Sequence, residues 1–189
     1  MNSVKIGLFF VFFATFAVAQ KNAVQLKIRI TNNYVDKIFL RNKTDIVLEI
    51  GMKKKGVFAT AFDIEEGVYQ LKYDTFYTDV YLKKGFNLSC TFDGLNFYES
   101  LKFSGSGAHE NNFIAAEFQK NDSIESSSFY NFSQSDLETY LTDIETTKLN
   151  KLALESFNPF FTDYETKCIK AQVLKMRDLY QDRRLTQKK

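Results

Sequence analysis

The chain has 189 residues, of which 25 are lysine or arginine and 23 are aspartate or glutamate, so the formal net charge is +2. This small charge produces no strong field, which argues against a partner that is nucleic acid or an anionic membrane. Hydrophobic residues make up 44% of the chain, which excludes wholesale disorder and suffices for a folded core.

The N-terminal residues have the pattern of a secretory signal peptide. Lys5 supplies a positive charge, residues 6–18 form an apolar run, and Ala17-Val18-Ala19 offers the small residues that signal peptidase requires. The apolar run is too short to span a bilayer comfortably, and polar residues follow it at once. We expect residues 1–19 to be cleaved and the mature chain to begin at Gln20. It would then be exported to the periplasm or cell envelope and keep no transmembrane segment.

Alternating hydrophobic residues predict a series of short strands in the first half of the mature chain. The expected strands are 24–30, 34–41, 46–50, 57–64, 69–73, 80–82, 86–92 and 95–103. Asp93-Gly94 separates the last two and is the strongest hairpin signal in the sequence. About seven or eight short strands with regular turns indicate an antiparallel β-sandwich, which we place at residues 20–104.

The hydrophobic period becomes helical after the glycine-serine segment 104–107. A short helix is expected to end near Asn121, and Ser135-Asp136-Leu137-Glu138 has the form of a capping box for a second helix. Asn158-Pro159 reads as the N-cap and first residue of a third, long helix. Residues 105–182 are therefore predicted to form a small helical bundle, and the fold class is α+β.

Cys90 and Cys168 are the only cysteines, and without a C-x-x-C pattern they form neither a redox dithiol nor a metal knuckle. Cys90 alternates with apolar Leu88 and Phe92. This alternation favours two small buried hydrophobic side chains, since cysteine is commonly buried. The alternative, in an oxidising compartment, is a disulfide between them, which would constrain the unfolded chain by about 4–5 kcal/mol.

The only histidine, His109, precedes Glu110 at the start of the expected short helix. A His-Glu pair can perform acid–base chemistry, and a helix N-terminus can bind an anion. No second histidine, nucleophile motif or phosphate-binding loop accompanies the pair. We interpret the preceding glycines as a sharp turn and Glu110 as a favourable charge in the first helical turn. The sequence therefore predicts no catalytic residue, no cofactor site and no metal site, and the protein is not expected to be an enzyme.

Two further patterns have both a structural and a functional interpretation. Lys53-Lys54-Lys55 lies in a turn between strands, where lysines usually form a solvated hairpin tip and not a phosphate site. Tyrosine and phenylalanine alternate along the strands and could form a platform for sugars. Core packing is the simpler explanation, because aromatic residues are favoured in strands in any case.

Four short motifs follow one another in a recognisable order. They are Gly67-Val68-Tyr69, residues 80–85 ending in Lys84-Gly85, Phe103-Ser104-Gly105-Ser106-Gly107, and Glu110-Asn111-Asn112-Phe113-Ile114. This order resembles the N-terminal accessory region of TlpA/ResA-like thiol–disulfide oxidoreductases of the Bacteroidetes type. The resemblance implies a signal peptide, a β-sandwich-like domain and helices, followed in the family by a thioredoxin fold. It covers most of the mature chain, and its motifs mark architecture.

The family's activity resides in a C-terminal Trp-Cys-x-x-Cys motif, which this sequence does not contain, and neither Cys90 nor Cys168 matches it. The resemblance therefore implies a non-catalytic exported accessory domain. Such a domain would position or recognise protein or peptide substrates for a thioredoxin-like domain, in cis or in trans. Residues 183–189 are expected to be a basic tail or part of an interdomain linker. Their resemblance to a linker favours a chain truncated before the thioredoxin-like domain. The alternative is a stand-alone periplasmic module that binds a glycan or a peptide.

Overall fold

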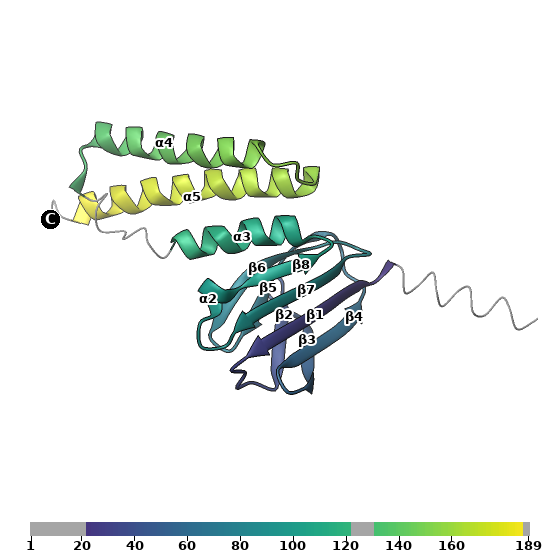
Figure 1. The fold of residues 1–189 in the computed structure, drawn as a ribbon. Helices are drawn as coiled ribbons and strands as arrows, with labels where there is room; N and C mark the ends of the chain where they lie inside the picture. The colour runs from purple at the N-terminus through teal and green to yellow at the C-terminus, as the bar shows by residue number, and fades with distance from the viewer. Residues whose placement is uncertain (1–21, 122–130, 187–189) are drawn as a thin grey trace, which may run out of the picture. The chain divides into compact units, whose positions relative to one another are not determined.

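The computed structural model describes residues 22–121 and 131–186, as a β-rich unit followed by a helical unit (Figure 1). The β-rich unit extends to Gln119 and the helical unit begins at Lys120. The α+β class expected from the sequence is confirmed. Within the described residues, no helix combines the length and the apolar character needed to cross a bilayer. The expected signal peptide, residues 1–19, lies outside the described part of the chain.

The described residues of the β-rich unit form the following strands and helices. The strands are β1 (Val24–Thr31), β2 (Lys37–Arg41), β3 (Ile46–Lys54), β4 (Val57–Phe62), β5 (Gly67–Tyr73), β6 (Phe76–Leu82), β7 (Asn87–Asp93) and β8 (Lys102–Gly105). The helices are α2 (Phe97–Ser100) and α3 (Ala108–Asn121), and α3 ends where the two units join.

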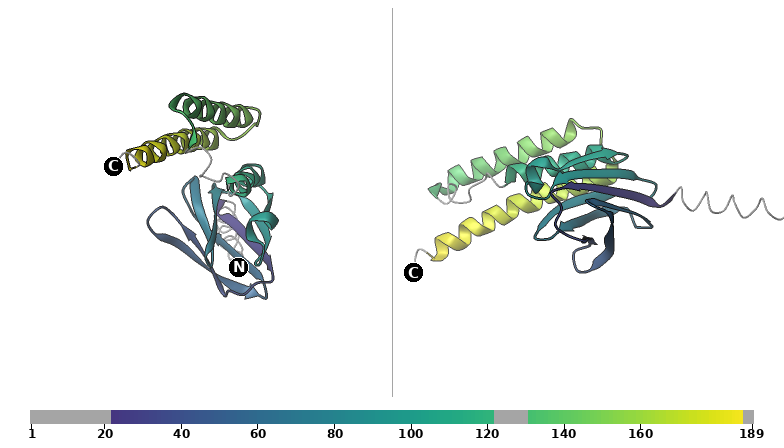
Figure 2. Two further views of the ribbon diagram at one scale, coloured as in Figure 1. Left: turned by 90° about the vertical axis from the view of Figure 1, so that its left-hand side faces the viewer. Right: turned by 60° about the horizontal axis from the view of Figure 1, so that its bottom comes forward.

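The sheet differs from the expected antiparallel sandwich. Its strands are hydrogen-bonded in the order β6-β5-β2-β3-β4-β1-β7-β8, so all eight belong to one sheet, which curls as a half-barrel (Figures 1 and 2). The sheet is mixed, because β1 pairs with β7 in parallel while the other neighbours are antiparallel. Alternation in the sequence shows only that each strand buries one face. Strands do so both in two packed sheets and in one curled sheet, so the pattern does not distinguish these architectures.

The core lies on the concave side of this sheet. In β1 the residues at even positions, from Val24 to Ile30, are buried and the intervening ones are exposed, as the alternation predicted. The parallel register sets Ile28 beside Cys90 and Ile30 beside Phe92, so β1 and β7 bury matching side chains. Cys90 is completely buried, which confirms the expectation for this cysteine.

The chain reversal at Asp93-Gly94 is longer than the expected two-residue hairpin. β7 and β8 do pair antiparallel, but α2 lies between them where a continuous strand 95–103 was expected. Phe97 of α2 is 2% exposed, and its ring packs on the rings of Tyr73, Phe76, Phe92 and Tyr98. The short helix forms because it delivers this aromatic side chain to the core, a long-range contact that outweighs the local turn preference.

Two adjacent asparagines of α3 attach the helix to both edges of the sheet. Asn111 is fully buried; its Oδ1 accepts from the backbone N–H of Tyr81 (2.8 Å) and its Nδ2 donates to the carbonyls of Tyr81 (2.9 Å) and Gly107 (2.8 Å). Asn112 bonds the backbone N–H (2.8 Å) and carbonyl (3.0 Å) of Phe103 in the same way. Tyr81 lies in β6 and Phe103 in β8, the two edge strands. Each amide therefore replaces the backbone of a missing neighbouring strand.

The helical unit consists of α4 (Gln134–Ala153) and α5 (Pro159–Thr186), an antiparallel pair. They pack through a core of leucine, valine, methionine and tyrosine side chains, comprising Leu137, Leu141, Val173, Met176 and Tyr180. Glu138 and Arg177 add a two-bond ion pair of 2.8 and 3.1 Å, which lowers the pKa of the Glu138 carboxyl.

The sequence predicted the start of α5 correctly and the start of α4 only approximately. Asn158 accepts from the Phe160 N–H (2.9 Å) immediately before Pro159, as expected. The N-cap of α4 is Ser133, which accepts from the Asp136 N–H (3.1 Å), so the capping box predicted at Ser135 is wrong by two residues. Both serines can cap a helix, so their type does not distinguish them.

The asparagine pair gives a first prediction. Asn111→Ala leaves the buried N–H and carbonyl of Tyr81 without the partner that the Asn111 amide supplies, so we expect it to lower the free energy of unfolding by about 2–4 kcal/mol. Asn112→Ala is the matched control, because Asn112 is exposed and water can replace its amide. Its cost should stay below about 1 kcal/mol. Urea titration of both variants measures the difference, and equal losses would contradict the assignment.

Candidate functional site

The His109-Glu110 pair lies in the first turn of α3, where the sequence placed it. His109 is exposed, and Glu110 is one of the charges that act on the hydroxyl of Tyr81. Burial first, and then its hydrogen bond to Glu66, raise the pKa of Tyr81, so that hydroxyl stays protonated. Within the described residues, no group of three histidine, cysteine, aspartate or glutamate side chains is arranged to hold a metal ion.

The two cysteines lie in different environments. Cys90 is a free thiol inside the β-rich core, and burial raises its pKa, which disfavours the thiolate that disulfide exchange needs. Cys168 lies on α5 and is exposed, so the expectation that it would be a small buried side chain is wrong. The helical pattern placed it near the apolar stripe of α5, but Ile169 and Val173 are the buried members of that stripe.

The aromatic side chains of β4, β7 and β8 do not form an outer platform. Phe58, Phe92 and Phe103 of β4, β7 and β8 are members of the buried core, as is Tyr73 of β5. The packing explanation for these residues is therefore confirmed. The opposite faces of β1, β7 and β8 carry the polar positions of each alternation.

Lys53 and Lys54 end β3 and Lys55 begins the β3–β4 connection; all three are exposed, as expected for a hairpin tip. Gly56 follows them with a φ of 66°, and its carbonyl accepts from the Ile30 N–H (2.7 Å). A Cβ at Gly56 would collide with the Ile30 carbonyl, so glycine is required for this close approach. The contact holds Lys55 beside the end of β1, which the sequence pattern did not show.

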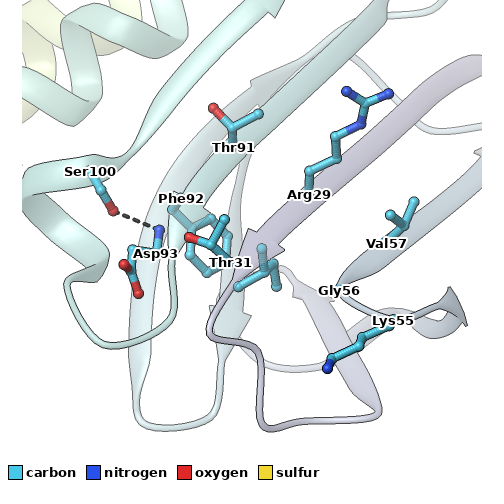
Figure 3. Close-up of a pocket in the computed structure, with 10 residues that line it drawn as sticks. Arg29, Thr31, Lys55, Gly56, Val57, Thr91, Phe92, Asp93 and Ser100 are labelled. Carbon is cyan, nitrogen blue, oxygen red and sulfur yellow. Dashed lines mark hydrogen bonds between the residues drawn. The ribbon is translucent and has the colours of Figure 1, made fainter.

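A hollow of about 460 Å³ lies at this point on the outer surface of the sheet (Figure 3). Arg29 and Thr31 of β1 stand beside Thr91 of β7, and Lys55 approaches from the β3–β4 connection. The remaining lining comes from Ile30, Gly56, Val57, Phe92, Asp93 and Ser100. Sequence reasoning missed this group because the parallel β1–β7 pair brings together residues that are distant in the chain. The exposed alternate positions of β1 were its only local signal.

The two polar side chains that could suggest chemistry in this hollow are held by other groups. Ser100 Oγ accepts from the Asp93 N–H (2.7 Å) and donates to the carbonyl of Asn96. The Asp93 carboxylate accepts two bonds from Asn32 Nδ2 (3.0 Å each) and one from the Leu95 N–H (2.9 Å). These bonds leave the cations and threonine hydroxyls as the groups that can contact a ligand. The arrangement suits binding of a polar, anionic group.

Comparison with known protein families, with curated proteins and with solved structures finds no match. The relation to TlpA/ResA-like proteins therefore stays a prediction from the four motifs.

The thiol environments predict a two-step reaction with Ellman's reagent. At pH 8 the exposed Cys168 should react at once, whereas Cys90 should react only after urea unfolds the β-rich unit. The Cys168→Ser variant should lose the fast step and keep the slow one, as measured by absorbance at the thiolate product band. Fast labelling in Cys168→Ser would show that Cys90 is accessible and would contradict its burial.

Proposed function

We propose that the chain is an exported, non-catalytic accessory module that positions or recognises substrate for a thioredoxin-like disulfide reductase. The observation that supports this proposal most is the structural role of the motif that carries the family resemblance. Gly107 has a φ of 82° at the turn into α3, and Asn111 and Asn112 bond the two sheet edges. This structural use of the motif supports an accessory role for the module.

The thiols support the non-catalytic part of the proposal. A reductase needs a low-pKa, accessible thiolate with a second cysteine within reach. Cys90 has a raised pKa in the core, and Cys168 belongs to the other unit. The thioredoxin-like partner, in the same chain or in another, would supply the dithiol and this module the contact with the substrate.

The alternative is a stand-alone binding module for a glycan or a peptide. The hollow beside Arg29 and Lys55 favours this alternative, since it offers cations and hydroxyls on an open surface. A Trp-Cys-x-x-Cys motif encoded in the same reading frame or the adjacent one distinguishes the two proposals. Its presence supports the accessory role, and its absence supports the stand-alone module.

The non-catalytic proposal predicts the outcome of an insulin-reduction assay. With dithiothreitol as the electron source, the full chain should precipitate insulin no faster than dithiothreitol alone. Cys168→Ser is the control and should give the same baseline, because Cys168 has no catalytic role in the proposal. Precipitation at the rate of an equimolar thioredoxin would overturn it.

Export predicts a defined N-terminus. Chain recovered from the cell envelope of a Gram-negative host should begin at Gln20 when its N-terminal sequence is determined. Ala17→Lys and Ala19→Lys place a large charged side chain where signal peptidase needs a small one, so both variants should accumulate as the uncleaved precursor. Ala14→Ser is the control. A mature chain that retains Met1 would contradict the proposal.

A further inference from the structure

The outer face of β1, β7 and β8 carries an ordered group of cations. Strand register aligns Arg29 of β1 with Thr91 of β7, and Thr91 with Lys102 of β8. Lys27 lies two residues before Arg29 and shares its face. With strands about 4.8 Å apart and residues about 3.3 Å apart along a strand, the backbone positions of Lys27 and Arg29 are about 7 Å apart, and those of Arg29 and Lys102 are about 10 Å apart. We refer to Lys27, Arg29, Lys102 and the adjoining Lys55 as the cationic face.

No carboxylate among the described residues pairs with the charges of the cationic face. Among the described residues of the β-rich unit, ion pairs join Lys37 to Glu49 (2.7 Å), Lys83 to Glu66 (3.4 Å) and Lys84 to Glu65 (3.8 Å). Within the described residues, none of the four cations of this face has an ion-pair or hydrogen-bond partner. The carboxylate of Asp93, which lines the adjoining hollow, accepts from Asn32 and Leu95.

Protection of a sheet edge does not explain these cations. Lysines often stand on edge strands, where they hinder pairing with another chain. Lys27 and Arg29 are on β1, which has β4 on one side and β7 on the other. Lys102 is on the edge strand β8, but Asn112 already bonds that edge at Phe103. The cations are therefore available for a partner that approaches the face of the sheet.

The other residues of this face indicate what the partner is. The remaining outward positions of the three strands carry only hydroxyl, amide and carboxylate side chains, namely Gln25, Thr31, Asn87, Ser89, Thr91, Asp93 and Ser104. A protein partner is normally held by buried aromatic or aliphatic anchors, which this face does not offer. Single-stranded nucleic acid is bound by aromatic stacking, and membrane binding uses apolar insertion. Charged groups among hydroxyls and amides fit a ligand that carries both carboxylates and hydroxyls.

We propose that the cationic face binds an acidic polysaccharide. Its carboxylates contact Lys27, Arg29, Lys55 and Lys102, and its hydroxyls bond the threonine and serine side chains on the same face of β1, β7 and β8. The hollow beside Arg29 accepts one anionic sugar unit, and the other cations contact neighbouring units along the strand. This proposal names a ligand class for the module and does not depend on a thioredoxin-like partner. It also places the ligand on the polar face of the sheet, opposite the aromatic core.

Affinity electrophoresis of the full chain in gels that contain polygalacturonate tests the proposal. Polygalacturonate should retard the chain at low salt, neutral dextran should not, and added sodium chloride should weaken the retardation by screening. In the variant Lys27→Gln/Arg29→Gln/Lys102→Gln, the apparent Kd should rise about tenfold, as expected for the loss of three surface charge contacts.

The matched control is Lys43→Gln/Lys84→Gln/Lys175→Gln, which removes the same charge from exposed positions elsewhere. It should bind as the natural chain does, and thermal unfolding verifies that both variants are folded. Equal weakening by both triple variants would show that net charge alone acts, and this result would overturn the proposal. Retardation by poly-L-glutamate as strong as that by polygalacturonate would indicate an acidic peptide ligand and would overturn it as well. Failure of the insulin or export predictions would leave this result unaffected.

Discussion

An open sheet has two edges with unpaired backbone groups, and in this protein one helical turn meets both. Asn111 bonds β6 at Tyr81, and the next residue bonds β8 at Phe103. Because consecutive residues are only about 3.8 Å apart, the two edges must converge on α3. The helix therefore holds the curl of the sheet and occupies each edge at one position where another strand could add. Any change that moved α3 would expose both edges at once, which explains why a buried side-chain amide is used where an apolar residue could not bond.

The elements of the fold could be predicted from local pattern, and their pairing could not. Alternation located the strands, including the buried and exposed positions of β1, and Asn158-Pro159 located the start of α5. The parallel β1–β7 pair and the single curled sheet depend on contacts between distant segments, about which alternation says nothing. The insertion of α2 likewise depends on the place that Phe97 finds among other rings. The burial of Cys168 was equally beyond local pattern, because a small rotation of α5 about its axis decides whether this side chain faces the core or the solvent.

The candidate site was hidden for a related reason. Histidine, cysteine, glycine and aromatic residues are the usual candidates for a functional site. In this fold they serve the turns, the core and the sheet edges. The polar positions of β1 and β7 look like ordinary solvent-facing residues until the register places Arg29 beside Thr91 and brings Lys55 to the same point. The surface thus results from the same alternation that builds the core: each buried residue of a central strand is followed by one that must face outward. What distinguishes the surface is that four cations lie near one another on one face, none of them paired with a carboxylate of the described residues.

The central position of β1 in the sheet affects the order in which the β-rich unit can fold. β1 is the first strand in the chain, yet its two neighbours are β4 and β7. Its second neighbour exists only after residues 87–93 have been synthesised, and the asparagines of α3 follow later still. Such long-range pairing makes folding slow compared with a fold of local hairpins. The first strand of the unit therefore lacks its second neighbour until β7 has left the ribosome, so the sheet is completed only late in synthesis.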